Sequence, residues 1–127
     1  MEKLVHKDLS YKIIGLIFKV FNKLGYGYQE KYYQRALALE LDREKIDYIQ
    51  EKEIKLDYQN KTIGKYFLDF VIENKIVVEL KVANIFYSQD IKQILSYLKA
   101  SGLALGILII ITKSDIKYKR IINIRDY

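Results

Sequence analysis

Three ionisable residues lie inside segments that are otherwise apolar. Asp69 lies in YFLDFVI (residues 66–72), and Glu79 and Lys81 lie in VVELKV (residues 77–82). An ionised side chain in such surroundings loses its hydration, so it needs a charged partner or a metal ion. Glu79 and Lys81 are two residues apart and therefore project from the same face of a strand. Two carboxylates and a lysine that meet there would suit metal-assisted chemistry on a phosphate ester, whereas a salt bridge at a strand end is the structural alternative.

Whether Asp69 joins the other two depends on the turn between the segments. A two-residue loop at Asn74-Lys75 would turn Glu79 away from Asp69. A three-residue loop, Glu73-Asn74-Lys75, would place Asp69 directly opposite Glu79, with the Cβ atoms roughly 5 Å apart. Asn74 tolerates the left-handed conformation that a loop of odd length often requires. The sequence leaves both registers open, and only the second register creates a shared cation site.

Hydrophobic periodicity predicts the elements that must position these residues. Apolar residues at helical spacing predict three helices, at Ser10–Leu24, Gln29–Arg43 and Ser88–Ala100. Alternating or β-branched segments predict five strands, one from Tyr48 to Tyr58 and others at residues 63–72, 76–83, 105–111 and 118–124. The order α-α-β-β-β-α-β-β predicts an α/β fold with a mixed β-sheet flanked by helices and a crossover helix.

Length and composition exclude several classes of protein. The chain has 127 residues, half of them hydrophobic, which predicts one domain over residues 1–127. The lack of cysteine excludes disulfides and thiolate metal sites, and a single histidine leaves little for a multi-histidine zinc site. No apolar run reaches the roughly 18 residues of a membrane helix, and the N-terminus does not resemble a signal peptide. We therefore expect a cytoplasmic protein without a membrane partner.

The net charge of +6 comes from 22 basic and 16 acidic residues. A basic surface favours polyanions such as nucleic acid, and a lysine-rich solvated surface is the alternative interpretation.

A longer pattern extends over residues 10–122. Its elements are Gly27, Glu30 and Tyr33, then Asp69-Phe70-Val71, Val78-Glu79-Leu80-Lys81 and Gln93–Lys99. In this order they resemble the GxxExxY family, which is assigned to the PD-(D/E)xK nuclease-like superfamily. The resemblance implies a restriction-endonuclease-like core. The chain departs from the family at Phe21 and Asp90, where we would expect histidine.

The resemblance also implies roles for individual residues in a nuclease that uses Mg²⁺ or Mn²⁺ to hydrolyse the phosphodiester bonds of DNA or RNA. Asp69 and Glu79 would bind the metal, with Glu30 as a further ligand. Lys81 would orient water or stabilise charge on the phosphate, and Gln93 would contact phosphate or water. Tyr33 would hydrogen-bond a carboxylate or a phosphate, or else pack in the core. The alternatives for the other two are that Glu30 only complements a helix dipole and that Gln93 is an exposed helix residue.

Two other functions are compatible with the sequence. One is a non-catalytic module that binds nucleic acid or a protein, and the other is a structural oligomer that uses the apolar strand Leu108–Ile111. The small size of the chain leaves little surface for selecting a substrate, which predicts a homodimer or a protein partner.

Overall fold

The computed structural model describes residues 5–123, which form three helices and five strands in the predicted order. The helices are α1 (Lys7–Leu24), α2 (Glu30–Arg43) and α3 (Ser88–Ser101). The strands are β1 (Tyr48–Tyr58), β2 (Lys61–Ile72), β3 (Ile76–Val82), β4 (Leu105–Ile111) and β5 (Ile116–Ile122). None of the helices within the described residues has the length and apolar character needed to cross a bilayer.

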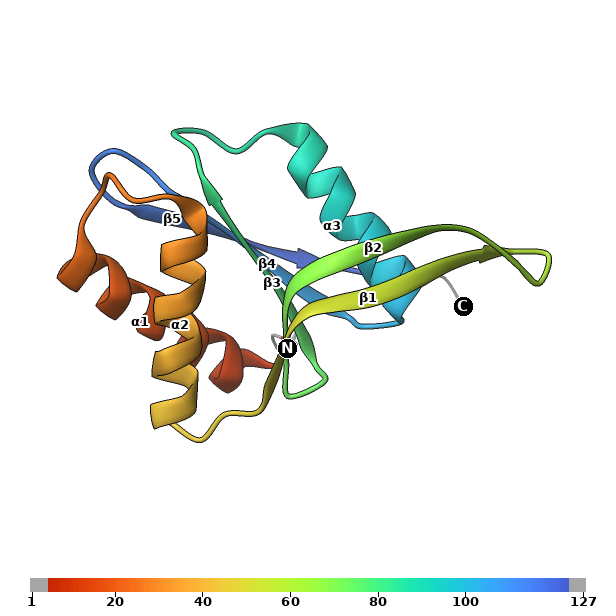
Figure 1. Ribbon diagram of the computed structural model, residues 1–127, viewed down its shortest axis with the longest axis horizontal. Helices are drawn as coiled ribbons and strands as arrows, with labels where there is room; N and C mark the ends of the chain where they lie inside the picture. The colour runs from red at the N-terminus through yellow and green to blue at the C-terminus, as the bar shows by residue number, and fades with distance from the viewer. Residues whose placement is uncertain (1–4, 124–127) are drawn as a thin grey trace, which may run out of the picture.

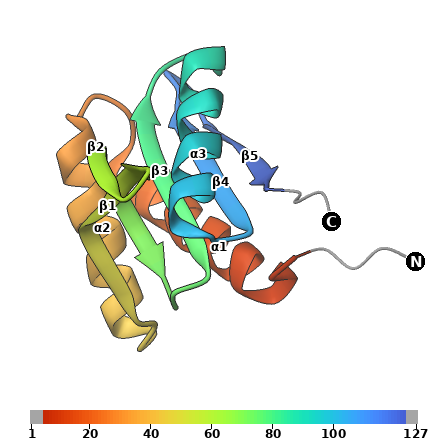
Figure 2. The ribbon, with the colours of Figure 1, turned by 90° about the vertical axis from the view of Figure 1, so that its right-hand side faces the viewer.

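The strands form one mixed sheet in the order β1-β2-β3-β4-β5. β3 and β4 are parallel and are connected through α3, whereas the other neighbouring strands are antiparallel. Helices α1 and α2 pack on one face of the sheet and α3 packs on the other, as Figures 1 and 2 show. The predicted α/β class, with a mixed sheet flanked by helices and a crossover helix, is therefore confirmed.

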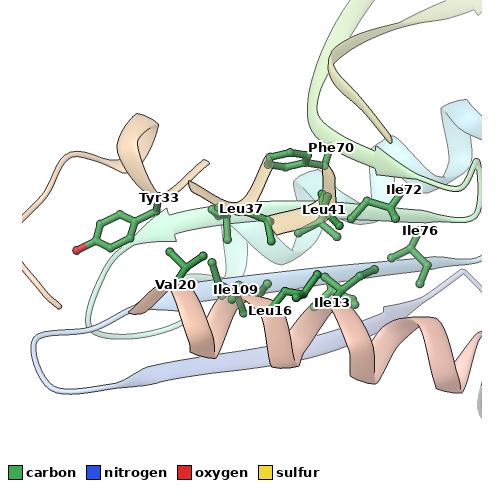
Figure 3. Packing of buried hydrophobic residues seen from close by; sticks show 14 of the residues in the cluster. Ile13, Leu16, Val20, Tyr33, Leu37, Leu41, Phe70, Ile72, Ile76 and Ile109 are labelled. Atoms are coloured by element: carbon green, nitrogen blue, oxygen red, sulfur yellow. The ribbon is translucent and has the colours of Figure 1, made fainter. Parts of the chain in front are cut away.

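Alternation along β3 separates the two faces of the sheet. Ile76, Val78 and Leu80 point into the core beneath α1 and α2, where Ile13, Leu37 and other apolar side chains cover them (Figure 3). Val77 belongs to the smaller apolar cluster beneath α3. Because side chains alternate along a strand, Glu79 and Lys81 project toward the α3 face with Val77.

Several element boundaries differ from the predictions by one turn or less. Three differ by one residue, since α2 begins at Glu30 rather than Gln29, α3 ends at Ser101 rather than Ala100, and β3 ends at Val82 rather than at residue 83. Helix α1 begins at Lys7 rather than Ser10, since Asp8 in its first turn complements the helix dipole. Strand β2 begins at Lys61 rather than at residue 63. Strand β5 begins at Ile116 rather than Tyr118, because a tight turn in which the Thr112 amide donates to the Asp115 carbonyl (2.8 Å) ends just before it. Strand β5 ends at Ile122, before the predicted end at residue 124, which itself lies outside the described residues.

Strand β4 is the buried central strand that its sequence predicted. All seven of its residues are buried, and β3 and β5 pair with its two edges. The interpretation of Leu108–Ile111 as an oligomer interface is therefore wrong, since this segment has no free edge and no exposed face.

Candidate active site

The turn between β2 and β3 has the three-residue form. The ladder pairs Phe70 with Val78 and Ile72 with Ile76, which leaves residues 73–75 as the loop. Glu73 and Asn74 adopt left-handed conformations, with φ of 53° and 52°. This turn selects the register in which Asp69 is the next residue opposite Glu79.

The two carboxylates replace the backbone ladder at the point where β2 separates from β3. The Asp69 amide donates a hydrogen bond to Glu79 Oε1 (3.2 Å), and the Leu80 amide donates one to Asp69 Oδ2 (3.1 Å). Each carboxylate thus accepts the amide that would otherwise lose its partner at the end of the ladder. These two bonds hold Asp69 and Glu79 against each other, and we call them the acidic pair.

Burial makes the acidic pair electrostatically costly. The Glu79 residue is only 4% exposed. This burial, together with the adjacent Asp69 carboxyl group, raises the pKa of Glu79 to about 9, and the two carboxyl groups are close enough to share a hydrogen bond. A pair of this kind requires a shared proton or a cation, because two buried like charges cannot both persist without compensation.

Lys81 contributes positive charge to the site without closing an ion pair. Its charge lowers the pKa of both Glu79 and Glu30, but burial outweighs it at each residue. Among the ion pairs formed within residues 5–123, none involves Lys81. The strand-end salt bridge that would explain Lys81 as a structural residue is therefore not formed in the described part of the chain.

Glu30 is the first residue of α2, and its side chain lies at the same end of the sheet. Its Oε1 accepts a hydrogen bond from the amide of Val82, the last residue of β3 (3.3 Å). Partial burial raises the pKa of Glu30; Lys81 opposes this increase, and the Asp69 and Asp90 charges add to it. Glu30 therefore does more than complement a helix dipole, because it connects α2 to the strand that carries Glu79 and Lys81.

Tyr97 on α3 lies close enough to the acidic pair to be influenced by its charge. Burial, followed by the charges of Glu79 and Asp69, raises the pKa of Tyr97 to about 12. Gln93 is exposed one turn before Tyr97 on α3, and within residues 5–123 it forms no hydrogen bond to Asp69 or Glu79. The Tyr97 ring also packs edge-on against Tyr66, with the ring centroids 5.0 Å apart.

Tyr97 is the neighbour of the pair that was not predicted as a site residue. Its spacing in the sequence could have identified it, because Tyr97 lies four residues after Gln93 and therefore shares the same helical face. Tyr33, by contrast, has the packing role. It is fully buried, and its hydroxyl donates to the Gly25 carbonyl (2.5 Å), which ties α2 to the end of α1.

The donor atoms of the acidic pair fit a hard divalent cation. Both residues offer carboxylate oxygens, which Mg²⁺ and Mn²⁺ prefer, and a divalent cation could replace the proton that otherwise relieves the repulsion between the two carboxylates. Within residues 5–123, no group of three or more Asp, Glu, His or Cys side chains is arranged to hold a metal ion. The structure therefore brings Asp69 and Glu79 together as a pair, with Glu30 as a separate neighbour that is bonded to Val82.

Comparisons with known proteins agree with this fold. The site lies in a restriction-endonuclease-like fold, a three-layer α/β architecture that its structural neighbours share. The sequence profile of the PD-(D/E)XK nuclease superfamily matches residues 7–121, so the chain belongs to this superfamily. No curated protein sequence matches the chain.

Two solved structures illustrate the structural similarity. The crystal structure of SSO0001 is 22% identical in sequence and superposes with a TM-score of 0.61, over 76% of this chain and 50% of that one. The chain thus spans half the length of SSO0001. The alkaline exonuclease LHK-Exo from Laribacter hongkongensis is 12% identical, with a TM-score of 0.56, over 98% of this chain and 73% of that one.

Proposed function

We propose that this chain is a metal-dependent nuclease that hydrolyses phosphodiester bonds of DNA or RNA. The observation that carries the proposal is the acidic pair beside Lys81, at the end of β3. Burying two carboxylates against each other costs stability, and a cation site on a phosphodiesterase provides a use for that arrangement. Membership of a nuclease superfamily and the net charge of +6 support the same conclusion.

The proposal gives each site residue a role. Asp69 and Glu79 would hold Mg²⁺ or Mn²⁺, with Glu30 as a further ligand. When bound, the ion would polarise a phosphate oxygen and acidify a bound water. The Lys81 ammonium group would orient that water or stabilise the charge that develops on the phosphate. Gln93 would contact phosphate or water from α3.

The proposal also includes the narrower assignment to the GxxExxY family. Gly27, Glu30 and Tyr33 supply the residues of that motif. In this chain the three have separate tasks, since Glu30 contacts the end of β3 and Tyr33 fastens α2 to α1, while Gly27 adopts a φ of 117° between the two helices.

Cleavage of labelled oligonucleotides tests the proposal. Single- and double-stranded DNA and RNA would be incubated with Mg²⁺ or Mn²⁺ and the wild-type chain or the double variant Glu79→Gln/Lys81→Ala. We expect the double variant to lose at least about 10³-fold in rate, because it lacks both a metal ligand and the positive charge. Cleavage that survives both substitutions would show that the activity comes from elsewhere.

A matched control variant is Lys12→Ala/Glu44→Gln. It removes an exposed ion pair (3.4 Å) between α1 and the residue that follows α2. The control has the same change in composition as the site variant, so it should cleave at the wild-type rate.

The non-catalytic alternative has one observation in its favour. Each member of the acidic pair accepts a backbone hydrogen bond, so the pair also closes the gap between β2 and β3. A module that only binds nucleic acid would use the pair for this purpose alone. In the assay above it would show no cleavage with either metal, and a separate binding measurement would show that it still binds the oligonucleotides.

A further inference from the structure

The segment Ala83–Tyr87, which we call the β3–α3 loop, is held firmly against the neighbouring β4–β5 turn. The Ala83 amide donates to the Ile111 carbonyl (3.2 Å), and Asn84 Oδ1 accepts a hydrogen bond from the Lys113 amide (3.1 Å). Phe86 packs on the apolar cluster beneath α3, with Lys119 Nζ 5.0 Å from the centre of its ring. The loop therefore has a defined position.

This fixed loop nevertheless exposes two large apolar side chains. Ile85 is 58% exposed and Tyr87 is 49% exposed, on either side of the more buried Phe86. Their neighbours hold the backbone but do not cover these side chains. An aromatic ring and an aliphatic side chain presented together by a fixed backbone form a surface on which a flat, apolar ligand group can stack.

The β3–α3 loop lies at the edge of the candidate active site. It follows Val82, whose amide bonds to Glu30, and it precedes Asp90, whose charge raises the pKa of Glu30. In Figures 1 and 2 the α1–α2, β3–α3 and β4–β5 connections lie at the same end of the sheet. A ligand that contacts Tyr87 would therefore continue toward the acidic pair.

Lysines flank the loop on its other side. Lys113 belongs to the β4–β5 turn, and Lys117 and Lys119 are exposed on β5. Lys119 pairs with Leu108, a member of the cluster beneath α3, so Lys117 and Lys119 share the sheet face that carries Glu79 and Lys81. Positive charges beside a stacking surface match a strand that alternates phosphates with flat bases.

We propose that the β3–α3 loop is a stacking surface for an unpaired nucleic-acid strand, with a base on Tyr87 and Ile85 and phosphates against Lys113, Lys117 and Lys119. This inference rests on the proposed nuclease function and adds the substrate class to it. A duplex offers little to this surface, because its base faces are stacked inside the helix. Single-stranded DNA or RNA, or an unpaired end, presents those faces.

The test measures binding without cleavage. Fluorescence anisotropy in EDTA would give dissociation constants for labelled single-stranded DNA, single-stranded RNA and a blunt duplex of the same sequence. We expect Tyr87→Ala to weaken single-strand binding roughly tenfold and duplex binding less than about twofold. Tyr87→Trp should retain single-strand binding, since stacking needs the ring and not the hydroxyl. The DNA and RNA arms show which strand is preferred.

Tyr11→Ala is the matched control. Tyr11 is 48% exposed on α1, on the opposite side of the sheet, so its loss should leave single-strand binding unchanged. A second variant, Lys113→Ala/Lys117→Ala, tests the phosphate contacts independently of Tyr87. It should reduce the slope of log affinity against log salt by about 1.4.

The outcomes separate this inference from the proposed function. The stacking surface would be overturned if Tyr87→Ala weakened single-strand and duplex binding equally. It would also be overturned if neither Tyr87→Ala nor Lys113→Ala/Lys117→Ala weakened single-strand binding. Both results would hold even if the chain cleaves nucleic acid. A selective loss of single-strand binding would support it even if the chain cleaves nothing.

Discussion

Glu79 combines three features of the candidate site in one carboxyl group. It is almost fully buried, it faces a second carboxyl group, and it accepts a backbone hydrogen bond that fixes its position. Carboxylates are rarely buried to this extent unless they are paired with an opposite charge or a metal. The raised pKa of Glu79 means that the metal-free chain holds a proton where the proposed enzyme would hold a cation.

The pH dependence of stability tests this interpretation of Glu79. A carboxyl group whose pKa is raised from 4.5 to about 9 adds stability that is fully present below pH 4.5 and is lost as the pH rises through about 9. At pH 9 without metal, Glu79→Gln should therefore be more stable than the wild type by more than about 1.4 kcal/mol, the value of one pKa unit. Urea unfolding from pH 5 to pH 9 measures the difference, and equal pH profiles would contradict the assignment.

Lys81 should matter for catalysis and little for stability. It forms no ion pair within residues 5–123, so Lys81→Ala should change the free energy of unfolding by less than about 0.5 kcal/mol. Removing a cation that faces the reacting phosphate should reduce kcat by about 10²–10³-fold. A variant that unfolds readily but cleaves normally when folded would assign Lys81 a structural role instead.

At the scale of elements, a three-residue turn determines whether the site exists. The sequence predicted both strands and placed Glu79 and Lys81 on one face, because alternation along a strand is a local property. It left the register open, since the loop length depends on which residues adopt left-handed conformations. Glu73 and Asn74 do so here, with φ near 50°. The hydrogen bonds of the acidic pair to backbone amides could not be predicted, because they arise only where β2 and β3 separate.

The strain of this turn can be measured at Asn74. A β-branched residue is poorly tolerated at positive φ, so Asn74→Val should destabilise the chain by about 1–2 kcal/mol. Asn74→Gly should stay within about 0.5 kcal/mol of the wild type. Lys75→Val is the control, because Lys75 is exposed and has no positive φ. Equal losses from the two valine variants would show that the backbone conformation at Asn74 is not the cause.

Close packing of α3 on the sheet positions Tyr97 near the acidic pair. A Cβ atom on Gly106 of β4 would lie 2.6 Å from Ile94 Cγ2, a buried and branched side chain. Gly106→Ala should therefore destabilise the chain by about 1–3 kcal/mol, and combination with Ile94→Ala should cost less than the sum of the two single changes. Gly15→Ala on α1, where no atom lies within 4 Å, should stabilise the chain by about 0.5–1 kcal/mol. Urea unfolding of the four variants tests both signs.

At the scale of the whole molecule, the sequence predicted the order of elements and the fold class. This succeeded because the apolar periodicities of α1, β4 and the other long elements are strong and agree with one another. The contacts between distant segments could not be predicted in this way. The link from Glu30 to Val82 joins residues 52 positions apart, and the hydrogen bond from Lys113 to Asn84 depends on how two loops meet. The expected homodimer or protein partner stays a prediction, which light scattering can test.

Calorimetric titration of the metal-free chain with Mn²⁺ tests the central claim most directly, because it measures cation binding without requiring a substrate. We predict a saturable heat for the wild type and for the exposed control Glu44→Gln, and no such heat for Asp69→Asn or Glu79→Gln. Heats that are the same in all four proteins, or absent from all of them, would contradict the claim that the acidic pair is a cation site.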